Sequence, residues 1–326
     1  MIHDFTKKTL VRGLAACCGL AMMIGLAACG GDASATASSS ASSSSATPSA
    51  SASSTLAEMT GITASNEIGQ KPAIKLPTVP YTVPDGGYQV LQQGNGETLQ
   101  DGMRMCMHSV AVSAKTGAEI YSSWESAPDC SVSLEQSSLR NGLYDVLKNQ
   151  KVGALIALGV NDTTATDDAQ KSYIMATTIV SASHDLTRAE GQTVTDIPSN
   201  LPKVTLDGNG KPSIDMNGYQ PDGQLVVQPL IKGSGATVSE SGSVKVNYTG
   251  WLTDGTQFDS SWDRGEASEF ALSQVVTGWK EGLAGQTVGS QVLVIVPPDK
   301  GYGSTAQGSI PANSTLVFVV DILATY

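Results

Sequence analysis

The chain has 326 residues and carries 30 acidic against 19 basic side chains, a formal net charge of −11 at pH 7. Its length accommodates two domains of ordinary size together with segments that belong to neither. Such acidity argues against a nucleic-acid partner and against electrostatic adhesion to anionic lipid.

Residues 1–28 predict a secretory signal peptide. Basic residues precede an apolar run from Gly13 to Leu26, which is too short to span a membrane. Leu26-Ala27-Ala28 then leads directly into Cys29, a pattern that resembles a bacterial lipobox. The resemblance implies cleavage before Cys29 and a lipid on its sulfur. The expected product is a lipoprotein on the outer face of the cell membrane, held there by the lipid alone. The alternatives are an ordinary secreted protein and lipidation at Cys17.

Residues 29–70 predict a disordered tether behind the lipidated cysteine. Every position from Ala33 to Thr55 is Ala, Ser or Thr except Pro48. Because such a segment has nothing to bury in a core, it should behave as a flexible linker.

An internal repeat organises the rest of the chain. Residues 116–124 line up with 254–262, and Gln150-Lys151-Val152-Gly153 lines up with Gln286-Thr287-Val288-Gly289. Residues 71–182 are therefore predicted to be a degenerate copy of residues 222–326. Residues 183–221, which contain several prolines and glycines, are predicted to be a linker.

The second copy predicts an α+β domain. Alternating apolar residues indicate strands over 244–252, 291–296 and 316–323, and Asp254-Gly255 provides a hairpin turn after the first of them. One short helix is expected near 277–283. In each copy we expect an antiparallel, curved sheet wrapped over one short helix.

The order of aromatic, acidic and glycine residues in the second copy closely resembles the FKBP family of peptidyl-prolyl cis/trans isomerases. Phe258-Asp259-Ser260-Ser261 is followed by Val276-Thr277-Gly278-Trp279 and then by residues 297–303, and the match is unbroken from about Leu225 to Tyr326. The resemblance implies an isomerase that assists the folding of exported proteins. Its substrates would be proline-containing segments of unfolded chains, and macrolide inhibitors are candidate ligands.

The resemblance also assigns a site. Trp279 would form the floor under the proline ring. The remaining catalytic candidates are Tyr248, Phe258, Asp259, Tyr302 and Phe318. The substrate-binding candidates are Arg264, Phe270, Val275, Val276 and Ile310, with Arg264 paired to Asp259 and Ile310 providing a backbone amide.

Rotation about an X-Pro bond needs no cofactor or metal. The barrier of about 18–20 kcal/mol comes from the lost planarity of the amide, and no bond is made or broken. A dry aromatic slot and polar groups placed against the rotated carbonyl favour the twisted amide. A metal site is not expected either, because His108 and His184 have no Cys or His at ligand spacing.

Two departures from the family pattern affect the binding of long ligands more than catalysis. Ser268 stands where the family usually has an aromatic residue, and the loop before Ile310 is slightly short and has no histidine. Both reduce contact with long hydrophobic ligands such as macrolides.

The first copy keeps the core pattern and loses the site. The residues expected against Tyr248, Asp259, Arg264 and Trp279 are Val110, Tyr121, Ser126 and Leu143. The first copy also contains Cys106 and Cys130, for which we predict a disulfide in an oxidising exterior, a free buried pair being the alternative.

Two other functions compete with catalysis. The first is a non-catalytic chaperone or holdase that binds proline-containing segments without turnover. The second is a solute-binding lipoprotein, which the pattern disfavours because it shows no pair of α/β lobes.

Overall fold

The computed structural model describes residues 56–326 except positions 66, 85 and 141. The predicted signal peptide, Cys29 and the Ser/Ala-rich tract up to residue 55 lie outside these residues. The described chain forms two compact units. The first takes in the residues up to Pro128 together with Val132–Ala182, and the second takes in Asp129–Ser131 and Ser183–Tyr326. Within the described residues, no helix has the length and apolarity needed to span a membrane.

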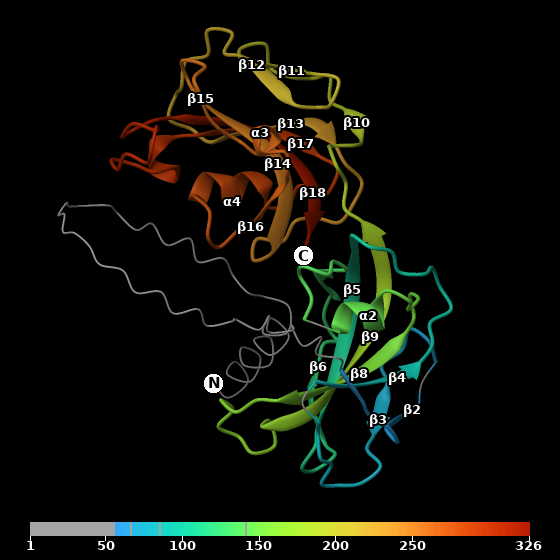
Figure 1. Ribbon diagram of the computed structural model, residues 1–326. Helices are drawn as coiled ribbons and strands as arrows, with labels where there is room; N and C mark the ends of the chain where they lie inside the picture. Colours follow the sequence, from blue (N-terminus) through green and yellow to red (C-terminus); the bar gives the residue numbers. More distant parts are fainter. Residues whose placement is uncertain (1–55, 66, 85, 141) are drawn as a thin grey trace, which may run out of the picture. The chain divides into compact units, whose positions relative to one another are not determined.

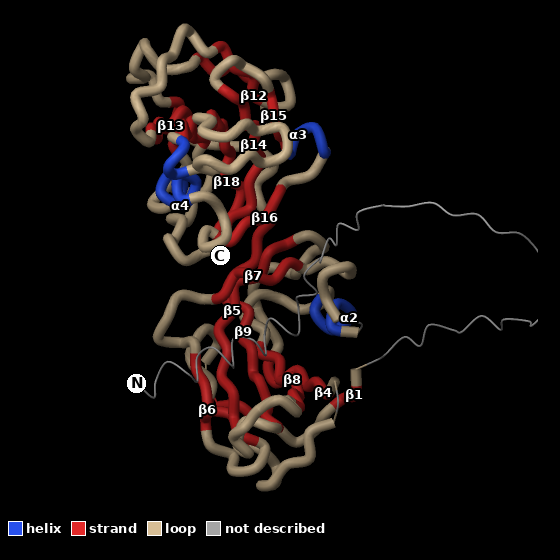
Figure 2. Tube along the Cα trace, turned by 90° about the vertical axis from the view of Figure 1, so that its left-hand side faces the viewer, coloured by secondary structure: helices blue, strands red, loops and turns tan. Residues whose placement is uncertain are grey.

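The second unit is a seven-stranded sheet with short helices (Figures 1 and 2). The strand order is β10-β13-β17-β18-β14-β15, with β16 paired to β14, and the pairs are antiparallel. The strands are β10 (Gln192–Thr193), β13 (Val226–Lys232), β14 (Ser243–Leu252), β15 (Gln257–Ser260), β16 (Ser268–Ala271), β17 (Gln291–Val296) and β18 (Leu316–Thr325). The helices are α3 (Ser261–Arg264), α4 (Thr277–Leu283) and the 3-10 turn η1 (Pro298–Lys300). The predicted strands and the helix near 277–283 are confirmed.

Both faces of this sheet are buried. Along β18, Phe318 and Val320 pack into the cluster beneath α4, whereas Val317 and Val319 face the opposite cluster. On the first face, Gly278 lets α4 lie directly on the sheet, because a Cβ at that position would be 2.4 Å from the Val296 side chain. This close approach sets the depth at which the following residue, Trp279, enters the core.

The predicted linker over 183–221 is wrong, because this segment is part of the second unit. It contains the hairpin of β11 (Lys203–Leu206) and β12 (Pro212–Asp215). Leu201 is buried, and apolar residues of the hairpin pack on Trp251 and the other residues of the second sheet face. Prolines and glycines suggested a linker, but an apolar sheet face needs a cover, and the hairpin supplies it.

The first unit has a sheet of the same strand order, β1-β4-β8-β9-β5-β6, with β7 paired to β5. The strands of this sheet are β1 (Ala57–Glu58), β4 (Gly87–Gln92), β5 (Met103–Ser113), β6 (Glu119–Ser122), β7 (Asp129–Ser133, of which residues 129–131 are grouped with the second unit), β8 (Leu155–Asn161) and β9 (Ser172–His184), and the helix of the first unit is α2 (Leu143–Leu147). A hairpin of β2 (Thr63–Ser65) and β3 (Ala73–Lys75) accompanies the sheet, as β11–β12 does in the second unit.

The prediction that residues 29–70 form a disordered tether is wrong for the C-terminal part of this range. Strand β1 pairs in parallel with β4, and Met59 and Ile62 are 3% exposed and belong to an apolar cluster of the first unit. Low-complexity composition ends at about Thr55, and the apolar residues that follow are enough to order the chain.

Hydrogen bonds correct one detail of the repeat. The N–H of Ser109 donates to Ser123 Oγ at 2.9 Å, and the N–H of Tyr248 donates to Ser261 Oγ at the same distance. Ser109, not Val110, is therefore the counterpart of Tyr248. The run Val110-Ala111-Val112 contains no landmark residue, so the sequence alignment was one position out of register there.

Both predicted disulfide partners are disulfide-bonded. Cys106 lies in β5 and Cys130 in β7, and these two strands are paired.

Candidate functional site

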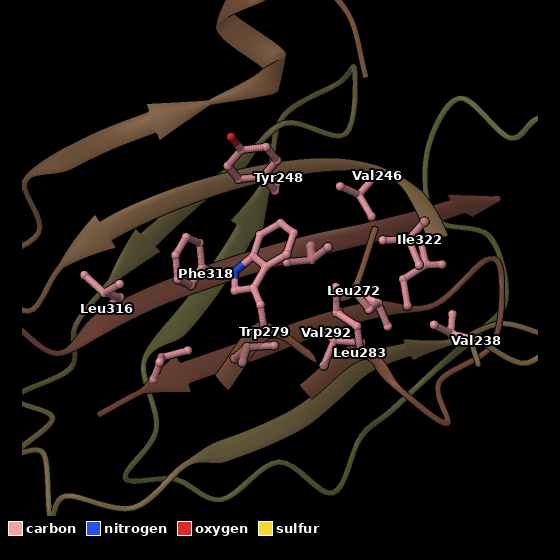
Figure 3. Close-up of a cluster of buried hydrophobic side chains, with 14 of the residues drawn as sticks. Val238, Val246, Tyr248, Leu272, Trp279, Leu283, Val292, Leu316, Phe318 and Ile322 are labelled. Atoms are coloured by element: carbon pink, nitrogen blue, oxygen red, sulfur yellow. The ribbon is translucent and has the colours of Figure 1, made fainter. Parts of the chain in front are cut away.

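Trp279 lies at the centre of an aromatic cluster at the start of α4 (Figure 3). The indole is 5% exposed. Its ring centroid is 5.3 Å from each of the rings of Tyr248, Phe270 and Phe318, and all three contacts are edge-to-face. Such contacts fix ring orientation as well as burying apolar area. The cluster can therefore present a rigid aromatic surface.

The indole Nε1 of Trp279 is buried and has no hydrogen-bond partner. Figure 3 shows this nitrogen on the side of the ring that faces Phe318. The edge-to-face contact between Trp279 and Phe318 joins the floor of the site to strand β18.

Phe258 forms a wall next to Phe318, with centroids 5.5 Å apart and ring planes at 87°. The two rings approach the backbone of β14 closely at Gly250. A Cβ at Gly250 would be 2.6 Å from Phe258 Cζ and 2.9 Å from Phe318 Cε1. Only glycine leaves room for both rings in these positions.

Tyr248, Asp259 and Arg264 form a polar group next to the aromatic cluster. The Tyr248 hydroxyl donates to one oxygen of the Asp259 carboxylate, and Arg264 donates from Nη1 to the other oxygen. Arg264 Nη2 also donates to the Tyr248 hydroxyl oxygen at 3.2 Å. Burial, followed by the hydrogen bond to Asp259, raises the pKa of Tyr248 to about 12. Tyr248 is therefore neutral at physiological pH and acts as a donor.

Ser268 has a role that the sequence did not reveal. Its hydroxyl accepts a hydrogen bond from Arg264 Nη2 at 3.1 Å. The residue that departs from the family pattern thus holds the guanidinium that pairs with Asp259. Hydrogen bonding to the Tyr248 hydroxyl is the main cause that raises the pKa of Arg264, and Asp259 adds to it.

Ser261 was also missed, although it positions two site residues. It is fully buried at the start of α3, accepts from the Tyr248 N–H and donates to Asn247 Oδ1 at 3.0 Å. These bonds fix the point where β15, which carries Asp259, turns into the helix that carries Arg264. A signal was available, because both copies contain two consecutive serines here.

The predicted role of Ile310 as a backbone donor is wrong. Its N–H already donates to the Gln307 carbonyl at 2.8 Å, and its side chain is buried in the cluster around Trp279. Val276 offers a donor instead. Its carbonyl accepts from the first turn of α4, while its own N–H has no acceptor among the described residues.

The other predicted binding residues divide into two groups. Phe270, Val275 and Val276 are half-buried and pack on the cluster. Tyr302 is 39% exposed on the loop between β17 and β18, and in the described part of the chain no ring contact joins it to the cluster. The base of this loop is anchored on α4 by the pair Lys300–Glu281 at 2.6 Å.

The comparisons with known proteins bear on this geometry. The sequence model described as FKBP-type peptidyl-prolyl cis-trans isomerase matches residues 235–323. A probable FK506-binding protein of Corynebacterium glutamicum is 37% identical over 115 residues, which are 35% of this chain and 98% of that protein. The chain belongs to the FKBP-type peptidyl-prolyl cis-trans isomerase family.

Other FKBP-type relatives are longer than the matched region. FkpA of Aeromonas hydrophila is 52% identical over 92 residues, which are 28% of this chain and 34% of that protein. The crystal structure of FkpA from Escherichia coli matches with 37% identity over 37% of this chain and 51% of that chain, with a TM-score of 0.30. The chain thus spans about a third of the A. hydrophila protein, and the family match lies in the second unit.

The first unit lacks the FKBP-type site at each matched position. Strand registers and backbone hydrogen bonds give its counterparts of Tyr248, Phe258, Asp259, Trp279 and Phe318 as Ser109, Ile120, Tyr121, Leu143 and Met175. The loop that carries Tyr302 is also reduced, because β8 and β9 extend as a hairpin from Leu155 to His184.

Proposed function

We propose that the second unit catalyses cis/trans rotation of X-Pro bonds. The single observation that carries the proposal is the floor of Trp279 bordered on one side by the Tyr248–Asp259–Arg264 group. The aromatic walls exclude water from the proline ring and its amide, which favours the less dipolar, twisted bond. The Val276 N–H, which has no acceptor among the described residues, is a donor at the rim for the rotating carbonyl. The single proton of the Tyr248 hydroxyl is held by Asp259.

The proposed reaction requires no proton transfer. Asp259 accepts from both Tyr248 and Arg264, so it orients the two donors rather than acting as a base. A rate that changes little around neutral pH follows from this arrangement, because Tyr248 has a pKa raised to about 12 and the pKa of the Arg264 guanidinium is also raised, so neither changes charge near neutral pH.

We also propose the finer organisation suggested by the sequence. The shared strand order and the repeated hairpin support the view that the first unit is a degenerate FKBP-like copy. The N-terminal pattern supports a lipoprotein anchored at Cys29 on the outer face of the membrane, where exported proteins would be its substrates. Macrolide inhibitors are proposed ligands of the same slot.

A protease-coupled peptide assay tests catalysis. The chain lacking residues 1–29 should accelerate cis-to-trans conversion of an X-Pro peptide, and the uncatalysed rate in its presence would refute the proposal in favour of a holdase. A fragment used to localise activity should begin at residue 183, because the segment 183–221 covers one face of the sheet.

The anchor is tested separately. Replacement of Cys29 by Ser should release the protein from the membrane fraction and abolish labelling with a lipid precursor. Continued labelling of that variant would exclude Cys29 and direct attention to Cys17.

A further inference from the structure

We propose that the β11–β12 hairpin is a positioning element for the isomerase site and that it acts through Lys211 on Arg264. The inference rests on the proposed function, because it concerns how the slot of the second unit is held in shape. It concerns a segment outside the family match, which covers residues 235–323.

Arg264 needs external support. It is the last residue of α3, a helix of four residues without a side-chain cap at its N-terminus. A helix this short is not stable on its own, so contacts with its neighbours must set its orientation. The Arg264 side chain is also 43% exposed, and water therefore competes for its hydrogen bonds to Asp259 and Tyr248.

The hairpin contacts the residue directly before Arg264. Lys211 Nζ pairs with Asp263 Oδ1, while Gln257 Nε2 on β15 donates to Asp263 Oδ2 at 2.8 Å. One carboxylate thus joins the hairpin, the helix that carries Arg264 and the strand that carries Asp259. This carboxylate therefore fixes the distance between the Arg264 guanidinium, which the helix carries, and its acceptor Asp259, which the strand carries.

The hairpin end of this bridge is itself fixed. Asp207 Oδ1 accepts the backbone N–H of Asn209 at 2.8 Å and that of Lys211 at 2.9 Å. Gly210 adopts φ of +96°, and its missing Cβ would be 3.4 Å from Trp262 Cη2, so the loop rests on the indole of α3. Lys211 therefore extends from a closed loop that already contacts the helix.

The first unit supplies a natural comparison. Its hairpin has the matching lysine, Lys71, but Lys71 Nζ pairs at 2.7 Å with Glu119 on strand β6, at the position of Gln257. In the described part of the first unit no helix lies between β6 and β7, the place that α3 takes between β15 and β16, and no counterpart of Arg264 needs support there. The lysine reaches a helix only in the copy that has the site.

The test combines Lys211→Met, Lys211→Arg and Lys71→Met with the peptide assay on the chain lacking residues 1–29. Exposed ion pairs contribute little, so Lys211→Met should lower kcat/KM only modestly, by about two- to fivefold. Lys211→Arg should restore it, and the matched control Lys71→Met should leave it unchanged.

A double-mutant cycle separates positioning from general stability. If Lys211 acts through Arg264, Lys211→Met should have no further effect in an Arg264→Met background, whereas a purely structural role would lower kcat/KM equally in both. Asp263→Asn gives a second way to break the bridge if Lys211→Met folds poorly. Full activity of Lys211→Met and Asp263→Asn, or equal loss in both backgrounds, would overturn the inference.

Failure of the proposed function can be told apart from failure of this inference. If the parent chain does not accelerate isomerisation at all, the function is wrong, and the position of Arg264 is then followed by its side-chain Nε–H signal in ¹⁵N-resolved NMR. The inference expects that signal to shift and exchange faster with water in Lys211→Met but not in Lys71→Met. An unchanged signal would refute it.

Discussion

Replacing Gly250 by Ala tests whether one methyl group can displace the walls of the proposed proline slot. Gly250 has no positive φ, so alanine fits its backbone conformation. The obstacle is steric, because the new Cβ would be 2.6 Å from Phe258 Cζ and 2.9 Å from Phe318 Cε1. Carbon atoms pack at about 3.5–4.0 Å, so the two rings must withdraw by roughly 0.6–1.4 Å.

Two magnitudes follow from this displacement. Overpacking of this kind costs about 1–3 kcal/mol of stability. Because the displaced rings are the walls of the proposed slot, we expect kcat/KM to fall about tenfold, equivalent to about 1.4 kcal/mol of transition-state stabilisation.

The assay pairs urea unfolding with peptide isomerisation, and the first unit provides the control. Its residue at the same register position is Ala111, beside Ile120 and Met175 rather than two phenylalanines. Ala111→Gly should leave kcat/KM unchanged. A folded Gly250→Ala variant with the activity of the parent would refute the argument that Gly250 shapes the slot.

Two further predictions concern charged residues of the second unit. Asp259→Ala should lower kcat/KM by about tenfold to a hundredfold, because it releases Tyr248 and Arg264 together, and parental activity in the peptide assay would rule out this role. Asp321 is buried, and burial raises its pKa despite hydrogen bonds from Ala189 N–H and Gln291 Nε2. The folded state therefore favours protonated Asp321, and its contribution to stability falls as pH rises from the usual Asp value through the raised pKa. Urea unfolding of Asp321→Asn should show a stability gain over the parent that grows from pH 4 to pH 7, and a gain that shrinks over this range would contradict the assignment.

The parts of the fold that the sequence predicted are those with strong local patterns. Residues 291–296 and 316–323 are apolar enough to be read as strands, and the turn at Asp254-Gly255 is confirmed by the φ of +87° at Gly255. The aromatic cluster could be predicted because Trp279, Phe258 and Phe318 stand in a fixed family order.

The errors have a different physical origin, since each depends on packing or backbone geometry that the residue types alone do not reveal. The segment 183–221 is ordered by an apolar sheet face that its own composition does not reveal. Likewise, the N–H of Ile310 is consumed by a tight turn with Gln307, and only the backbone geometry shows this. The hydrogen bond from Arg264 to Ser268 was not foreseen, because it depends on how β16 lies against β14.

The comparison between the two units separates what the fold needs from what the site needs. Both units keep the hairpin, and in both it packs on the sheet face that the short helix leaves uncovered. Three features are found in the second unit and not in the first: Gly250, Ser268 and the Lys211–Asp263 pair. The first unit has the same sheet and hairpin, but Ala111 takes the place of Gly250, and Lys71 pairs with a strand residue instead of a helix residue. The first unit keeps the same strand order without these residues, so the fold does not require them. Their presence in the second unit is therefore best explained by the slot around Trp279.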